Sequence, residues 1–232
     1  MKTNLYLVLF LSALGANLLG IQLNKESVQF LSKPLIIAAL AGYFIFSTVD
    51  IISKLKKWII LALFFSWAGD VLLMFQPKDE LFFLLGLASF LIAHIFYIIY
   101  FHHVRVNEGI KGNPWLLVLV VIYYAVLINL LMPYLGTMKI PVLVYGVVIS
   151  FMLMLAMHML LIKQKIAGRW MMTGALLFVI SDSILAINKF YHPFPAASIL
   201  IMITYGLAQL FIVQGAIKYL RQHSKPLAGG NN

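Results

Sequence analysis

Length, composition and charge exclude a water-soluble globular protein. The chain has 232 residues, of which 63% are apolar and only 10% charged, and its mean hydropathy is +0.99. Soluble domains carry about 25% charged residues, so this chain has too little polar surface for water to cover. Its net charge of +10 is more typical of basic loops beside anionic lipid headgroups than of nucleic-acid binding. The chain has no cysteine, which excludes disulfides, thiolate metal sites and a cysteine nucleophile.

Eight apolar runs are long enough to cross a membrane, which takes about 20 residues. In chain order they are Leu5–Leu23, Pro34–Ile52, Trp58–Gln76, Leu81–Phe101, Trp115–Met132, Ile140–Ile162, Trp170–Phe190 and Ala197–Leu220. The runs are continuously apolar rather than alternating, which favours helices over barrel strands. The first run begins like a signal peptide, but it stays apolar to its end, which favours a retained span. We expect an all-α membrane bundle of about eight helices in one domain, 1–222, and a short polar cytoplasmic tail, 223–232.

The distribution of Lys and Arg predicts the orientation of the chain. Twelve of the 17 basic residues lie on the side of the two termini, and five lie on the other side. Basic loops stay in the cytoplasm, so we expect both termini there. We expect a multi-pass protein of a bacterial inner (cell) membrane.

Two carboxyls lie inside the apolar runs. Asp70 follows Trp58 by 12 residues, and Asp182 follows Trp170 by 12. A charge within the hydrocarbon costs about 2.5–3.5 kcal/mol on insertion scales, so a functional role is favoured over a packing role. Their equal depth predicts one shared cavity. The sequences Gly69-Asp70-Val71-Leu72-Leu73 and Ser181-Asp182-Ser183-Ile184-Leu185 are also similar. This similarity suggests a parallel repeat of four plus four helices.

Other polar side chains share helix faces near these carboxyls. By helical spacing, Ser66 precedes Asp70 by one turn, and the pairs His94/Tyr97 and Tyr205/Gln209 each share a face. Tyr145 lies on an apolar stripe of the sixth run, and Ser181 precedes Asp182. His94 is the one deep imidazole, which argues against a metal site, although Asp70, His94 and Asp182 could form a minimal one.

Several strings resemble the YhhN-like lysoplasmalogenase family. They are Lys33-Pro34, Ser66-Trp67-Ala68-Gly69-Asp70-Val71-Leu72-Leu73, Gly86 to Tyr97, Pro141 to Tyr145, Gly174 to Ser183, and Tyr205-Gly206-Leu207-Ala208-Gln209. The resemblance covers the second to the eighth run, in order. It implies an eight-span enzyme that cleaves the vinyl ether bond of lysoplasmalogens, which are lysophospholipids. The products would be a fatty aldehyde and glycerophosphoethanolamine or glycerophosphocholine.

The residues are compatible with that chemistry. A vinyl ether is cleaved after protonation of its β-carbon, and water then attacks the oxocarbenium ion. Two carboxyls can serve as acid and as cation stabiliser, as in glycoside hydrolysis, without cofactor or metal. We therefore predict Asp70 and Asp182 as catalytic residues. Predicted substrate contacts are Lys33, Ser66, His94, Tyr97, Tyr145, Ser181, Tyr205 and Gln209, with Lys33 as an interfacial anchor or a phosphate ligand.

Two other functions remain open. A transporter or lipid-handling protein could use Asp70 and Asp182 as a proton relay, and repeats are common in carriers. A metal-dependent membrane amidohydrolase would need more deep histidines than the sequence supplies. The sequence does not distinguish the headgroup, the acid of the two Asp residues, or the oligomeric state.

Overall fold

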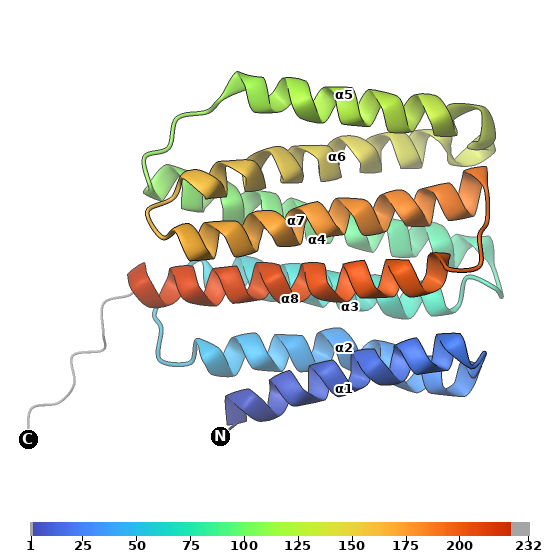
Figure 1. Ribbon diagram of the computed structural model, residues 1–232, viewed down its shortest axis with the longest axis horizontal. Helices are drawn as coiled ribbons and strands as arrows, with labels where there is room; N and C mark the ends of the chain where they lie inside the picture. Colours follow the sequence, from blue (N-terminus) through green and yellow to red (C-terminus); the bar gives the residue numbers. More distant parts are fainter. Residues whose placement is uncertain (1, 224–232) are drawn as a thin grey trace, which may run out of the picture.

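The computed structural model describes residues 2–223, and every regular element in that range is helical. The eight α-helices are α1 (Lys2–Gln22), α2 (Glu26–Ser47), α3 (Lys56–Met74), α4 (Glu80–Asn107), α5 (Pro114–Leu131), α6 (Lys139–His158), α7 (Lys165–Ala186) and α8 (Ala197–His223). All eight are long and apolar enough to cross a membrane, and they lie side by side with roughly parallel axes (Figure 1). The chain is therefore an integral, multi-pass membrane protein, as its composition predicted.

Tighter or wider helical turns join or extend some of these helices. They are the 3₁₀ turns η1 (Met132–Tyr134), η2 (Gly136–Met138) and η3 (Met159–Leu161), and the π-helical turn η4 (Ile187–Tyr191). The start of α1 and the end of α8 lie at the same end of the bundle (Figure 1), as an even number of spans requires. The opposite end, formed by the connections 23–25, 75–79, 132–138 and 187–196, is called the distal end below.

The second helix begins earlier than the hydropathy predicted. A start at Pro34 was wrong, because α2 begins at Glu26 and carries Pro34 in its interior. Proline lacks an N–H and so cannot donate to the Phe30 carbonyl one turn earlier. Its own carbonyl accepts a hydrogen bond from Trp67 Nε1 at 3.1 Å, which ties α2 to α3. The helix also ends at Ser47 rather than Ile52. Lys33 is thus in the second turn of α2 and not before it.

The other boundaries differ by a turn or two. α4 continues to Asn107 and α7 begins at Lys165, because polar residues at the headgroup level still make helical hydrogen bonds. α6 ends at His158 and continues as a 3₁₀ turn. Of the predicted tail, only His223 is described, and it still belongs to α8; residues 224–232 lie outside the described residues. The division at 222 stays a prediction.

Close helix pairs position the two carboxyl-bearing helices. α3 packs most extensively on α4, and α7 on α8. A Cβ at Gly69 would lie 2.7 Å from the Phe90 ring, and one at Gly174 would lie 2.7 Å from the Ala208 carbonyl oxygen. These contacts fix the rotation of α3 and α7 and therefore the direction of their Asp side chains. The four-plus-four repeat stays a prediction.

The fifth helix is the most loosely attached. α5 lies at the edge of the bundle (Figure 1) and packs mainly on α6. It has the smallest buried share of the eight spans. Most of its surface therefore lies on the outside of the bundle.

Candidate active site

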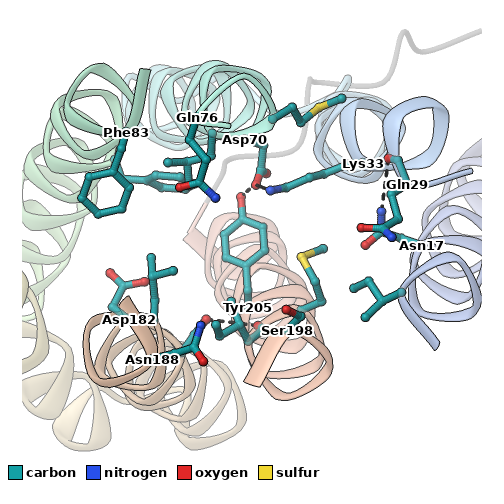
Figure 2. Close-up of a pocket in the computed structure, with 18 of the residues that line it drawn as sticks. Asn17, Gln29, Lys33, Asp70, Gln76, Phe83, Asp182, Asn188, Ser198 and Tyr205 are labelled. Carbon is teal, nitrogen blue, oxygen red and sulfur yellow. Dashed lines mark hydrogen bonds and ion pairs between the residues drawn. The ribbon is translucent and has the colours of Figure 1, made fainter. Parts of the chain in front are cut away.

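Asp70 and Asp182 line one cavity, as their equal depth predicted. Its volume is about 480 Å³, which is within the usual range for a small-molecule site. Figure 2 shows the Tyr205 ring between the two carboxyls, with Lys33 beside Asp70. The polar lining residues are Asn17, Glu26, Gln29, Lys33, Asp70, Gln76, Tyr145, Ser181, Asp182, Asn188, Ser198 and Tyr205.

The cavity belongs to the distal half of the bundle. Asp70 lies four residues before the end of α3 at Met74, and Asp182 lies four residues before the end of α7 at Ala186. With a rise of 1.5 Å per residue, each carboxyl-bearing residue is only about 6 Å from the end of its α-helix. Exposed lining residues such as Gln76 come from this same end. The polar part of a ligand can therefore reach the carboxyls from the distal surface.

Asp70 is held by a tyrosine and faces a lysine. Tyr205 Oη donates to Asp70 Oδ2 at 2.6 Å, and Lys33 Nζ lies 3.8 Å from Oδ1. The Asp70 side chain is 4% exposed and that of Lys33 is 21% exposed. Lys33 thus supplies a positive charge to the cavity beside the Asp70 carboxylate.

Asp182 is held by a tyrosine but has a different neighbour. Tyr145 Oη donates to Asp182 Oδ2, and His94 Nε2 lies 3.9 Å from the same oxygen. The Asp182 side chain is 16% exposed. Asp182 is therefore the more open carboxyl, beside a phenol and an imidazole rather than an ammonium group.

Four of the predicted site residues lie behind the cavity lining. Gln209 accepts a hydrogen bond from Tyr97 Oη at 2.5 Å and donates to Ser66 Oγ at 2.9 Å, and it also interacts with Tyr205. His94 packs on the Phe178 ring, with centroids 4.6 Å apart. All four residues, namely Ser66, His94, Tyr97 and Gln209, are fully buried. Their role in substrate binding stays a prediction; in the structure they support the residues that hold the carboxyls.

His94 keeps unused hydrogen-bonding capacity. Neither ring nitrogen makes a hydrogen bond of ordinary geometry, although the Phe90 backbone one turn earlier interacts with the ring.

Ser181 lines the cavity, and its hydroxyl donates to the Ile201 carbonyl at 3.1 Å, which ties α7 to α8. Within residues 2–223, no three His, Asp or Glu side chains converge on a point where a metal ion could bind.

Sequence reasoning missed several polar residues that line the cavity near its opening at the distal end, which is called the mouth below. Glu26 and Gln76 are exposed there, whereas Asn17 is 1% exposed. Asn17 on α1 donates to Ser32 Oγ at 3.0 Å and to the Gln29 carbonyl at 3.3 Å, and Glu26 begins α2. An amide inside an apolar run, such as Asn17, was a usable signal. Glu26 and Gln29 lay outside the predicted spans because the second span was predicted to begin too late.

Fold and site together define a polytopic α-helical membrane protein with a two-carboxyl cavity. A model of the YhhN family matches residues 28–216, so the chain belongs to the YhhN family, as the motifs indicated. No solved structure matches the chain.

Three relatives illustrate the similarity. The chain is 32% identical to lysoplasmalogenase TMEM86B of Homo sapiens over 68% of its own length and 62% of the relative's. It is 34% identical to lysoplasmalogenase TMEM86A of Homo sapiens over 69% of its own length and 65% of the relative's. It is 30% identical to a lysoplasmalogenase of Mycobacterium bovis over 71% and 62%, respectively. The matched region therefore spans less than two thirds of these relatives.

Proposed function

We propose that this protein hydrolyses the vinyl ether bond of lysoplasmalogens and releases a fatty aldehyde and a glycerophospho-alcohol. The observation that carries the proposal is the pair of carboxyls, each held by a tyrosine, facing one cavity within the helix bundle. The relatives' shared name supports the substrate class. A buried cavity that opens to the surface also suits a lipid whose reactive bond lies next to its polar part.

The reaction needs one acid and one water molecule. The acid gives its proton to the β-carbon of the vinyl ether, and the double-bond electrons form the new C–H bond. The resulting oxocarbenium ion is attacked by water at the carbon bonded to oxygen, and a carboxylate takes the water's proton. The hemiacetal then breaks its bond to the glycerol oxygen, which receives a proton. The net change is the addition of one water molecule.

The neighbours of the two carboxyls suggest their roles. Lys33 faces Asp70 at 3.8 Å, so Asp70 suits the carboxylate that steadies the cation and orients water. Asp182 contacts the neutral Tyr145 hydroxyl and suits the acid that carries the proton. This division follows the two-carboxylate logic of glycoside hydrolysis, in which the two groups have different environments.

Lys33 has a second role in this proposal. Its ammonium group lines the cavity between Asp70 and the amides of Asn17 and Gln29 (Figure 2). Lysine serves as a point-charge ligand for phosphate. A lysoplasmalogen whose vinyl ether reaches the carboxyls would place its phosphate on the mouth side of Lys33.

The orientation of the chain decides which leaflet supplies the substrate. We propose that both termini are cytoplasmic, as the basic residues predict, so that the distal end faces outward. The chain has no cysteine, which allows a direct test. Lys78→Cys, on the distal connection, should react with a membrane-impermeant maleimide in intact cells, whereas Lys54→Cys should react only after permeabilisation. The reverse pattern would overturn the orientation.

The activity itself is tested with purified protein in detergent. Lysoplasmenylethanolamine and lysoplasmenylcholine should release aldehyde, with no loss of rate after chelator treatment. The matched controls are the 1-acyl and the saturated 1-alkyl ether lysophospholipids, which lack the vinyl ether and should remain intact. Cleavage of the acyl lipid would contradict the proposal. Binding of the vinyl ether without turnover would favour the lipid-handling function.

A further inference from the structure

A second, smaller cavity adjoins the carboxyl that we propose as the acid. It lies between α5, α6 and α7 and has a volume of about 40 Å³. Asp182 and Tyr145 line both this cavity and the larger one. Its other lining residues are largely apolar or aromatic, and they include Tyr124, Ile128 and Val179. The two cavities thus meet at the Asp182–Tyr145 pair. The smaller one is called the α5 crevice below.

The protein core leaves no straight path beyond the carboxyls. Directly below them, away from the distal end, Tyr97, Phe178 and Gln209 are fully buried. The Tyr97 hydroxyl is bonded to Gln209, and the Phe178 ring packs on His94 and Tyr205. An alkyl chain that enters from the mouth and passes Asp182 must therefore turn sideways.

We propose that the α5 crevice receives the first carbons of the alkenyl chain and directs the rest of the chain outward past α5 into lipid. The inference rests on the proposed function and names a binding subsite for the apolar half of the same substrate. The β-carbon of the vinyl ether is on the tail side of the ether oxygen. A tail in the crevice therefore brings that carbon next to Asp182, while the glycerol oxygen stays nearer Asp70 and Lys33.

The size and the walls of the crevice fit this role. A volume of 40 Å³ accepts about three water-sized groups, which corresponds to a short length of alkyl chain. The Tyr123 and Tyr124 rings form the α5 wall, and both side chains are only partly buried. The Tyr123 hydroxyl is hydrogen-bonded with Ser183 Oγ on α7, and the Tyr124 hydroxyl donates to the Leu143 carbonyl on α6. A longer chain that passes α5 must therefore displace the Tyr123 ring and break its bond to Ser183.

Ser150 offers a way to fill the crevice without touching the carboxyls. It lies on α6, lines the crevice, and its buried hydroxyl has no hydrogen-bond partner. Ser150→Leu therefore adds apolar bulk without breaking a hydrogen bond. Val147→Leu is the matched control, since Val147 is on the same helix but is 55% exposed on its outer surface.

The first test compares two substrates that differ only in chain length, an ethenyl lysoplasmalogen, whose chain ends at the β-carbon and does not enter the crevice, and a hexadec-1-enyl lysoplasmalogen. In Ser150→Leu, kcat/KM for the long substrate should fall by roughly tenfold or more, the size of a small apolar mismatch. The short substrate and the Val147→Leu control should stay within about twofold of wild type. If a well-folded Ser150→Leu variant changes kcat/KM by the same factor for both substrates, relative to wild type, the inference is overturned. If wild type cleaves neither substrate, the proposed function fails instead.

A second test uses the unaltered protein and does not depend on turnover. A saturated 1-alkyl ether lysophospholipid cannot be hydrolysed, and a diazirine at the fourth carbon of its chain marks the position of the tail. Photolysis should attach the lipid to α5 residues within 123–131, which line the crevice but not the larger cavity. Attachment elsewhere in the larger cavity without any attachment to α5 would overturn the inference, whatever the outcome with Ser150→Leu.

Discussion

Asp182→Asn removes the proposed acid while keeping the shape of the side chain. The Asn carbonyl can still accept the hydrogen bond that Tyr145 donates to Asp182, so the cavity should stay intact. General acid catalysis contributes about 10²–10⁴-fold, which corresponds to about 3–5 kcal/mol in the barrier. We expect kcat to fall by that factor, with a normal expression level and thermal midpoint.

Asp70→Asn removes the carboxylate that we propose stabilises the oxocarbenium ion. Lys33 then loses its partner at 3.8 Å, but it is 21% exposed to the cavity and can be hydrated. Folding should therefore survive, and activity should fall by about 10²–10³-fold, as when one transition-state electrostatic contact is removed. The double variant should be scarcely worse than the more damaged single variant, because groups that act together are not additive.

The assay measures aldehyde release per folded molecule in detergent. Asp50→Asn is the matched control, because Asp50 lies in the exposed turn after α2, and this variant should keep wild-type turnover. Well-folded Asp182→Asn or Asp70→Asn protein that retains more than about a third of wild-type turnover would refute the acid–base reasoning. Misfolding with intact activity per folded molecule would assign the carboxyls to packing.

Three further changes test the neighbours of the carboxyls. Lys33→Ala should raise KM more than it lowers kcat if the ammonium group binds the substrate phosphate, and an unchanged KM would return it to an anchor role. Gln209→Leu leaves the buried Tyr97 hydroxyl without its acceptor, which costs about 1–3 kcal/mol; a thermal melt in detergent should show a clearly lower midpoint. Gly174→Val should weaken the α7–α8 contact, because even a Cβ would lie 2.7 Å from the Ala208 carbonyl oxygen, and an unchanged midpoint would show that the helices separate at little cost.

The sequence predicted the helices and the two deep carboxyls for the same reason. Lipid excludes polar groups, so long apolar runs and rare charges within them are strong signals. Asp70 and Asp182 were therefore visible without any knowledge of packing. Helix ends were less visible. Glu26 and Lys33 lower the hydropathy at the start of α2, although both residues are part of the helix.

The partners of the carboxyls could not be predicted from spacing. Helical periodicity places Tyr205 and Gln209 on one face, but it does not say which neighbouring helix that face meets. In the structure Tyr205 reaches Asp70 across a separation of 135 residues, whereas Gln209 lies one layer behind. Such assignments depend on the rotation of each helix, which close contacts such as that of Gly69 with Phe90 determine.

The central claim, protonation of a vinyl ether carbon by a carboxyl, is tested most directly by the fate of the proton. Purified protein is supplied with a lysoplasmalogen in D₂O, and the aldehyde is reduced at once to the alcohol so that later exchange is prevented. The account predicts one deuterium on the carbon next to the former aldehyde carbon, and a rate that is slower than in H₂O. An aldehyde released without that deuterium would contradict the account, since cleavage would then have occurred without carbon protonation.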